Sequence, residues 1–241
     1  GFTNAELERA KTELLASIER SYNERTTRQN QSYAQEYYRN YLDAEPIPGI
    51  EYEYEYLKAV LPQLPVALVN QLAQQYITDN NVVISYLGKE NSDVVSVPTQ
   101  EEVLNIFNSV KTAEIEAPVE ETFDRPLVET APTAGTIVKE KFNKKLGTTE
   151  WTLSNGIKVV IKPTDFKNDQ IIMSMESEGG SSKIALNNLP SATLADAVIS
   201  YNGIGEFSVL DLQKVLTGKN VSVSPGISEY SESMSGTSTV K

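Results

Sequence analysis

The stretch WTLSNGIKVVIKP, residues 151–163, decides the fold class of the second half of the chain. Apolar and polar side chains alternate on both sides of Asn155-Gly156, a pair whose residues can both adopt positive φ, and this combination predicts a β-hairpin. Outward from it, the alternation recurs over residues 136–142 and over a strand at 169–175 that runs into Gly179-Gly180. An antiparallel sheet is therefore expected here.

Helices and further strands are expected after this sheet. A helix over residues 190–200 is followed by a second one, which Ser208 and Asp211 open as a capping box and which runs to Lys219. Because the last strand pattern continues to Lys241 with no terminating signal, we expect either an edge strand or a chain cut from a longer one. The predicted closing strands are short and rich in serine, at residues 221–224, 227–231 and 234–240.

The first part of the chain has helical periodicity. Thr3 and Glu6 form a capping-box pattern, and apolar residues then recur at helical spacing as far as Tyr22. A second helix is expected to end before Pro46. Its tyrosines recur every four residues and are interpreted as core and half-buried packing and not as a ligand-binding stripe. They are Tyr33, Tyr37 and Tyr41.

The middle of the chain contains one open choice. Residues 51–56 read EYEYEY, which alternates like a strand but flows into a helical pattern, so helix and strand remain equal alternatives. A helix over 65–76 and a buried strand over 82–87, ending at Gly88, are expected next. Prolines and the acidic stretch 114–124 then indicate a linker, in which residues 99–110 suggest one short helix lying against a surface.

Composition excludes several classes of function. The chain has 241 residues, of which 39% are hydrophobic, so it can bury a core. Its net charge of −12 opposes binding to nucleic acid or to an anionic membrane, whereas a basic partner segment is favoured. The absence of cysteine excludes a disulfide framework, and no apolar run approaches the roughly 20 residues that span a bilayer. The start lacks the features of a signal peptide, so it is interpreted as internal, with Gly1 as a cloning remnant.

No catalytic, metal-binding or cofactor-binding residue is assigned from the sequence. The usual zinc ligands histidine and cysteine are absent, and Asp196, on an alanine-rich helix, is interpreted as a solvated or capping residue. The serines near the predicted strand have no histidine to act as a base, so they are interpreted as exposed strand serines. Gly179-Gly180 and Gly203-x-Gly205 are interpreted as turns and not as a phosphate cradle. The serines are Ser174, Ser177, Ser181 and Ser182.

Residues 151–163 followed by 171–180 resemble the opening hairpin and second strand of a domain of the pitrilysin/insulinase family of zinc metallopeptidases. In that family the next helix carries His-x-x-Glu-His when the domain is active. Here residues 189–199 read LPSATLADAVI, with neither histidine nor glutamate, so the domain resembles a degenerate copy. Residues 201–224 look like the family's non-catalytic third domain, and residues 4–88 look like the end of the preceding domain.

The resemblance implies an α+β fold of antiparallel sheets with packed helices, in two partial metallopeptidase-like domains joined by a linker. Residues 1–90 would be the end of one domain, mostly helical and closing in a strand, 91–145 the proline-containing acidic linker, and 146–241 the beginning of the next. The parent would be a zinc endopeptidase of four related domains, with zinc and catalysis in the first domain, outside this chain.

The resemblance also implies partners. This chain would form a non-catalytic part of the peptide chamber, in contact with the peptide substrate and with other domains of the same polypeptide, and inactive alone. An alternative is an inactive partner subunit that binds peptide or protein, and a stand-alone extracellular binding module ranks last. A periplasmic or otherwise exported location would be compatible, with a signal peptide outside this stretch.

Overall fold

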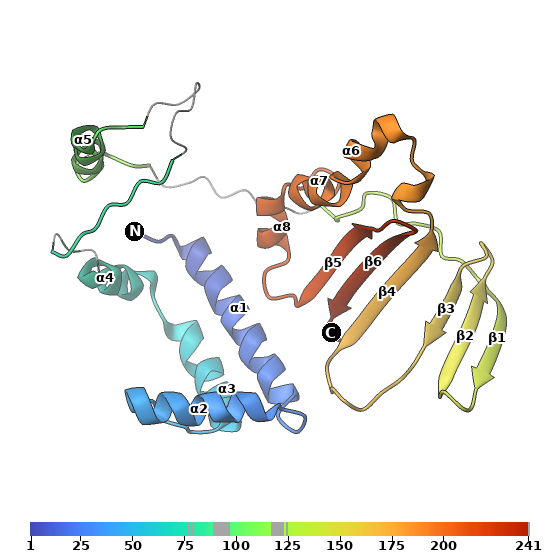
Figure 1. Cartoon of the computed structure of the whole chain (residues 1–241). Coiled ribbons are helices and arrows are strands. Elements are labelled where there is room, and N and C mark those ends of the chain that lie inside the picture. Colours follow the sequence, from blue (N-terminus) through green and yellow to red (C-terminus); the bar gives the residue numbers. More distant parts are fainter. Residues whose placement is uncertain (77, 79, 89–96, 117–122, 124, 241) are drawn as a thin grey trace. The chain divides into compact units, whose positions relative to one another are not determined.

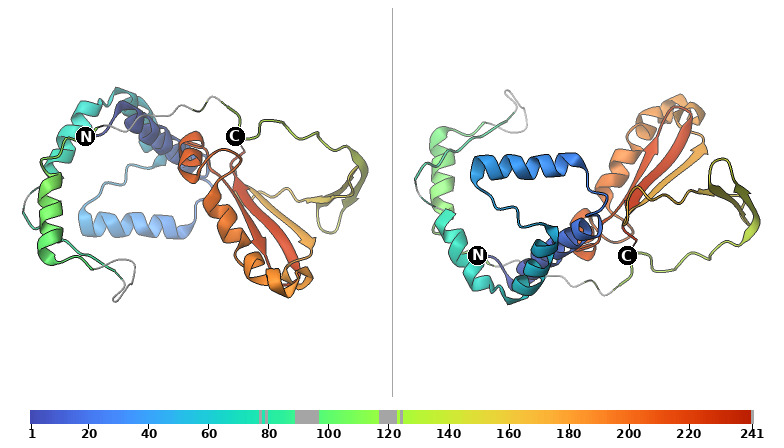
Figure 2. Two further views of the ribbon diagram at one scale, coloured as in Figure 1. Left: turned by 90° about the horizontal axis from the view of Figure 1, so that it is seen from above. Right: turned by 90° about the horizontal axis from the view of Figure 1, so that it is seen from below.

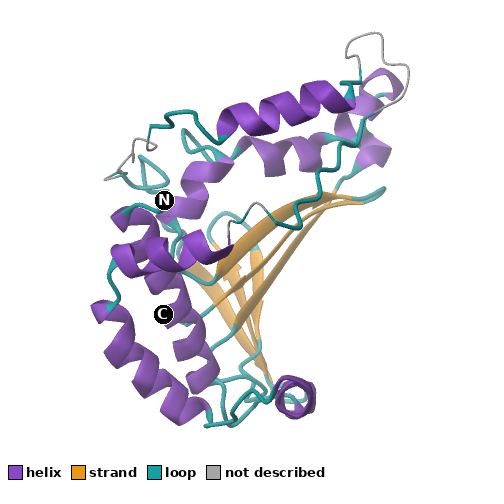
Figure 3. Ribbon diagram, turned by 90° about the vertical axis from the view of Figure 1, so that its left-hand side faces the viewer, coloured by secondary structure: helices purple, strands orange, loops and turns teal. Residues whose placement is uncertain are grey.

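The computed structural model describes residues 1–76, 78, 80–88, 97–116, 123 and 125–240 (Figure 1). The chain divides into two compact units, one formed by Gly1–Leu7 with Leu64–Thr122 and the other by Glu8–Gln63 with Phe123–Lys241. Helices and two small antiparallel sheets are both present, which confirms the expected α+β class (Figure 3). None of the described helices is both long enough and apolar enough to cross a lipid bilayer.

The first unit contains two helices that begin as predicted. α4 spans Val66–Tyr76, and α5 spans Gln100–Val110 behind a capping box formed by Thr99 and Glu102. The Asn70 side chain on α4 accepts a hydrogen bond from the Phe2 N–H at 2.6 Å and donates one to the Phe2 carbonyl at 3.0 Å. Within this unit, a short side chain on α4 therefore holds the beginning of the chain.

The strand predicted over residues 82–87 is not formed. These residues have no regular secondary structure, and Val83 and Leu87 are 90% and 93% exposed. A strand needs the hydrogen bonds of a neighbouring strand, and none of the described residues supplies one. Of the acidic stretch 114–124, residues 117–122 and 124 lie outside the described part of the chain.

Three helices open the second unit. α1 spans Asn4–Asn23, beginning in the first unit, and its expected capping box is present, with the Glu6 N–H donating to Thr3 Oγ1 at 3.2 Å. α2 spans Asn30–Asp43 and α3 spans Ile50–Val60. The EYEYEY stretch is thus helical. The Tyr54 ring of α3 stacks on the Tyr22 ring of α1 with the centroids 4.8 Å apart, and this contact joins the two helices.

The tyrosines of α2 correct a prediction. Tyr37 and Tyr41 are 64% and 86% exposed, and Tyr33 is 39% exposed, so they do not form a core. The helical periodicity was real, but no described element covers that side of the helix. Among the described residues, the buried apolar side chains are Leu7, Leu61 and Phe207. Leu61 begins the short 3₁₀ turn Leu61–Gln63 that follows α3.

The first sheet contains the predicted hairpin. Its strands are β1 (Ile137–Asn143), β2 (Thr148–Leu153) and β3 (Lys158–Ile161), in the order β1-β2-β3. The turn between β2 and β3 is closed by a 2.9 Å hydrogen bond from the Gly156 N–H to the Leu153 carbonyl. Gly156 has a φ of 87°, whereas Asn155 does not have positive φ. β1 lies inside the range 91–145 that the sequence indicated as linker.

The second sheet corrects the expected order of the last strands. β4 (Ile171–Glu178), β5 (Val221–Ile227) and β6 (Ser231–Ser238) pair in the order β4-β6-β5, so the last strand is central and not an edge. Two closing strands replace the predicted three, because Ser228 and Ser231 form a tight turn with the Ser228 N–H bonded to the Ser231 carbonyl at 2.8 Å.

Three helices lie between β4 and β5 in the sequence. The helix predicted at 190–200 is divided into α6 (Leu189–Ala192) and α7 (Ala195–Asn202). The break falls at Thr193 and Leu194, where the Thr193 hydroxyl bonds back to the Pro190 carbonyl at 2.9 Å. α8 spans Val209–Val215, shorter than predicted, behind the expected Ser208–Asp211 capping box. Figure 2 shows α7 running alongside the strands of the second sheet.

Candidate functional site

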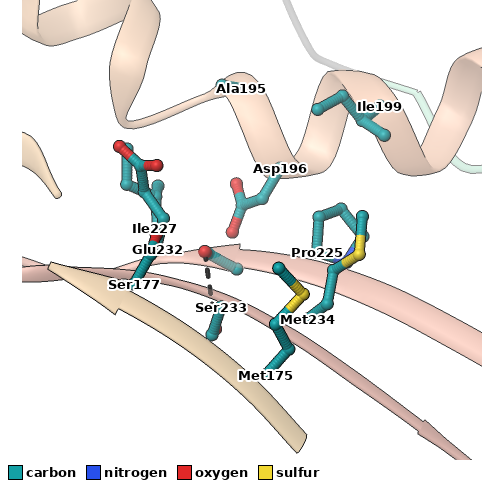
Figure 4. Close-up of a pocket in the computed structure, with 11 residues that line it drawn as sticks. Met175, Ser177, Ala195, Asp196, Ile199, Pro225, Ile227, Glu232, Ser233 and Met234 are labelled. Atoms are coloured by element: carbon teal, nitrogen blue, oxygen red, sulfur yellow. Dashed lines mark hydrogen bonds between the residues drawn. The ribbon is translucent and has the colours of Figure 1, made fainter. Parts of the chain in front are cut away.

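A pocket lies between α7 and the second sheet, with a volume of about 310 Å³ (Figure 4). Strand pairing builds its floor. Met175 of β4, Met234 of β6 and Pro225 of β5 are cross-strand partners and form one row across the sheet. Cross-strand partners point to the same side, so this row faces α7 together with the row beside it. That second row is Ser177, Glu232 and Ile227.

The sheet that forms the floor is amphipathic. The side toward α7 is largely apolar, while the other side has serine and threonine at many positions, including Ser222 and Thr237, whose hydroxyls lie 3.0 Å apart. Above the floor, α7 contributes Ala195 and Ile199 to the pocket lining. Met175 and Met234 remain 49% and 44% exposed, so α7 does not fill the space above them.

Two carboxylates line this mainly apolar pocket. Asp196 is in the first turn of α7, and its Oδ1 accepts a hydrogen bond from the Ala197 N–H at 2.7 Å. Figure 4 shows the Asp196 carboxylate pointing from α7 toward the strands. Glu232 belongs to the second floor row, at the beginning of β6. None of the ion pairs formed by the described residues includes either side chain.

With the other side chains that the structure describes, the two carboxylates do not form a metal centre. Among the described residues, no three side chains of histidine, cysteine, aspartate or glutamate stand together as metal ligands. The residues present therefore do not fit a zinc site, which usually takes three or four ligands that include histidine or cysteine. The chemistry that this pocket can perform is binding: apolar walls for a hydrocarbon chain and carboxylates for a cation.

The candidate residues named in the sequence analysis lie at different places in the structure. Asp196 and Ser177 line the pocket, whereas Ser174 pairs with Ser235 on the opposite, serine-rich side of the sheet. Ser181 and Ser182 lie in the short 3₁₀ turn Ser181–Lys183, where the Ser182 hydroxyl bonds to the Gly179 carbonyl at 3.2 Å. Gly180, Gly203 and Gly205 have positive φ, as expected for turn residues.

Glu232 is the pocket residue that sequence reasoning missed. The feature of the sequence that could have indicated it is that Glu232 is the single charged residue in a strand rich in serine. Its place in the pocket, however, depends on the order of the strands in the sheet. A Cβ added at Gly179 would lie 2.8 Å from Glu232 Oε1, so the absence of a side chain at Gly179 leaves room for this carboxylate.

Comparisons with known proteins identify a relative. No family model matches the chain. A zinc protease PQQL-like protein of Arabidopsis thaliana is 30% identical over 205 residues, which cover 85% of this chain and 21% of that protein. The chain thus spans about a fifth of the length of this relative.

Two solved proteases are similar in structure. The periplasmic protease PqqL of Escherichia coli is 19% identical, with a TM-score of 0.45, and the match covers 99% of this chain and 26% of PqqL. A mutant of the ferredoxin protease FusC, in complex with Arabidopsis ferredoxin, is 18% identical, with a TM-score of 0.44 and coverage of 98% and 28%. At these TM-scores, the relation to proteases rests on the sequence match to the Arabidopsis protein.

Proposed function

We propose, from the premise that this chain is related to zinc metallopeptidases of the pitrilysin/insulinase type, that it is a non-catalytic, peptide-binding part of a zinc endopeptidase. The relation is supported by the match of 205 residues to a zinc protease. The non-catalytic role is supported by the residue types of the chain, which contains no histidine and no cysteine for a zinc site. Zinc and the hydrolytic step would then belong to other parts of the parent polypeptide.

In this proposal, the pocket under α7 receives one basic side chain of the bound peptide. A lysine or arginine side chain joins an apolar stem to a cationic head, and the pocket joins apolar walls to two carboxylates. The observation that carries this proposal is the pair Asp196 and Glu232, which line a mainly apolar pocket with no cation from the described residues. The net charge of −12 would favour the approach of such a peptide.

The test compares cleavage of two peptides by the full-length protein, identical except for lysine or its uncharged analogue norleucine at one position. We expect the double variant Asp196→Asn, Glu232→Gln to raise KM for the lysine peptide by about tenfold with kcat unchanged, because an ion pair that forms on binding is lost. The norleucine peptide should show little change.

Glu176→Gln, which removes one negative charge outside the pocket, provides a control for overall charge when it is compared with each single pocket variant. Glu176 lies on β4 between Met175 and Ser177 and so points to the opposite side of the sheet, where it is exposed. If Glu176→Gln raised KM for the lysine peptide as much as each single pocket variant does, the pocket would not be the binding site and only overall charge would matter.

The alternative function is an inactive partner subunit of the same family. The observation that favours it is the complete absence of histidine over a stretch with the hairpin of a metallopeptidase-like domain. Zinc content and peptide hydrolysis of the full-length protein, each with and without a chelator, decide between the two. Bound zinc and chelator-sensitive hydrolysis support the endopeptidase, whereas peptide binding without zinc or hydrolysis supports the partner subunit.

A further inference from the structure

Because the EYEYEY stretch is helical, its three tyrosines lie on two different sides of α3. Tyr54 faces α1 and stacks on Tyr22, with the rings 4.8 Å apart at an interplanar angle of 20°. Tyr52 and Tyr56 are one turn apart on another side, where their rings stack with centroids 5.9 Å apart at 12°. These two rings are 61% and 51% exposed, so they form a paired aromatic surface in contact with solvent.

On the side of α3 that faces α1, here called the inner side, tyrosine rings and a glutamate bind cations of this chain. The Arg25 guanidinium lies 4.1 Å from the centroid of the Tyr22 ring, and Arg25 Nε lies 3.5 Å from Glu51 Oε1. The Lys58 ammonium lies 5.3 Å from the centroid of the Tyr54 ring. Both distances to the rings are within the range of cation–π attraction, and the carboxylate adds an ion pair. The chain therefore contains its own example of a cation held by stacked tyrosines and a glutamate.

The outer side of α3 repeats this chemistry without the cation. Helical spacing places Glu55 three residues after Tyr52, on the next turn of the helix, and its side chain is exposed like the two rings. Among the described residues, no cation lies over the Tyr52 or Tyr56 ring and no ion pair includes Glu55. Ala59, one turn beyond Glu55, adds no long side chain to this surface.

We propose that Tyr52, Glu55 and Tyr56 form a docking surface for an arginine of a basic peptide segment. Arginine fits better than lysine because its planar guanidinium can stack on a ring face while it donates hydrogen bonds to a carboxylate. The charge of the chain, −12, is complementary to such a segment. This surface is on α3, whereas the pocket lies between α7 and the second sheet, and it does not depend on a protease role for the parent.

Helix α2 provides a matched control. Tyr37 and Tyr41 are also four residues apart on a helix and are 64% and 86% exposed. Their rings do not form one of the stacked pairs found among the described residues. Replacing both pairs with alanine removes the same chemical groups from two exposed helical surfaces, and only the α3 pair should affect binding of arginine.

The experiment measures binding of a short peptide with two arginines, by titration calorimetry on the full-length protein in the presence of a chelator that prevents zinc-dependent hydrolysis. A peptide with citrulline in place of arginine keeps the planar shape but removes the charge and replaces one N–H donor group with a carbonyl acceptor. We expect Tyr52→Ala, Tyr56→Ala to weaken binding of the arginine peptide by about fivefold or more, and Glu55→Gln to weaken it by about threefold. Tyr37→Ala, Tyr41→Ala should leave its Kd within about twofold, as for exposed residues outside the site.

Two results would overturn the proposal: equal binding of the citrulline and arginine peptides to the unmodified protein, or equal weakening by the α2 and α3 double variants. A circular dichroism spectrum of each variant establishes that the helices are retained. If Tyr52→Ala, Tyr56→Ala perturbed α3, Tyr52→Leu, Tyr56→Leu would preserve helix propensity and bulk while removing the aromatic faces, and it should weaken binding to the same degree. If the pocket variant Asp196→Asn, Glu232→Gln did not raise KM for the lysine peptide, the proposal for the pocket would fail. The expectations for the α3 surface would be unchanged, so the two proposals are tested separately.

Discussion

The Glu24 carboxylate, just after α1, accepts a hydrogen bond at 2.7 Å from the backbone N–H of Asp169, a residue 145 positions further along the chain. The same carboxylate accepts the Thr27 hydroxyl at 2.7 Å and lies 3.3 Å from the Lys167 ammonium. Asp169 continues the junction, because its own carboxylate accepts the Val240 N–H at 2.8 Å. Within the second unit, the end of α1, the loop before β4 and the end of β6 are thus joined through two acidic side chains.

Replacing Glu24 should destabilise the second unit. Glu24→Ala leaves the Asp169 N–H without its partner and removes the carboxylate that accepts the Thr27 hydroxyl, and the Glu24 side chain is only 13% exposed. We expect a loss of about 1–2 kcal/mol in the free energy of unfolding, measured by urea titration. Glu19→Ala, at an exposed position on α1, is the control and should change stability by less than about 0.5 kcal/mol. Equal losses in the two variants would show that the junction contributes nothing specific.

The same junction should make stability depend on pH on the acid side. Burial alone would raise the pKa of Glu24, but the hydrogen bonds from Thr27 and the Asp169 N–H, together with Lys167, lower that pKa below its ordinary value of 4.5. A carboxyl whose pKa is lowered by folding stabilises the folded state above its unfolded pKa, and this contribution is lost as the pH falls through the lower, folded pKa.

The difference in stability between the unmodified chain and Glu24→Gln should therefore be constant from about pH 6 to pH 8 and should shrink below about pH 4.5. Urea titrations across this range measure the difference directly. A difference that stayed the same down to pH 3 would contradict the ionised junction.

Phe207 should be the most sensitive apolar position of the second unit. It is 2% exposed, its ring lies 5.6 Å from the Phe123 ring, and the Arg125 guanidinium lies 4.7 Å above it. Phe207→Ala leaves a cavity and should lower the free energy of unfolding by about 3–4 kcal/mol. Phe166→Ala is the matched control, because Phe166 is 77% exposed and should contribute little. Thermal unfolding of both variants measures the difference, and an equal fall of the two midpoint temperatures would contradict the prediction.

Local signals were predictable from the sequence, and long-range pairing was not. The capping boxes at Thr3 and Ser208 and the turn at Asn155-Gly156 depend on residues within three or four positions of one another, and all three are present. The central position of β6 depends on pairing with β4 and β5, which the alternation of one strand does not encode. The pocket was unpredictable for the same reason, since the place of Glu232 in its floor depends on that sheet order.

Burial was the other quantity that periodicity could not determine. Tyr37 on α2 and Tyr54 on α3 belong to equally regular patterns, yet only Tyr54 has a ring from another helix stacked on it. Periodicity identifies which side chains share a face, but whether that face is covered depends on another element. The exposure of Tyr37 and Tyr41 is therefore a property of tertiary packing, and the expectation of core and half-buried packing is wrong for these two residues.

Gly203 should tolerate no side chain, for two separable reasons. Its φ of 84° and ψ of −157° lie in a region that is essentially restricted to glycine, and a Cβ there would lie 2.0 Å from the Phe207 carbonyl oxygen. That oxygen also accepts the Ile204 N–H at 3.0 Å, so moving it away would break a backbone hydrogen bond beside the buried Phe207 ring. We expect Gly203→Ala to cost at least about 2–3 kcal/mol of unfolding free energy.

Gly147→Ala separates the strain in φ from the clash. Gly147 has a φ of 64°, but a Cβ at this position would meet nothing within 4 Å, so only the backbone penalty of about 1–2 kcal/mol applies. The urea midpoints of the two variants should differ, with Gly203→Ala the less stable. Similar midpoints would mean that the 203–207 turn relaxes to accommodate a methyl group. The burial of Phe207 would then depend little on the close approach of Gly203 to the Phe207 carbonyl.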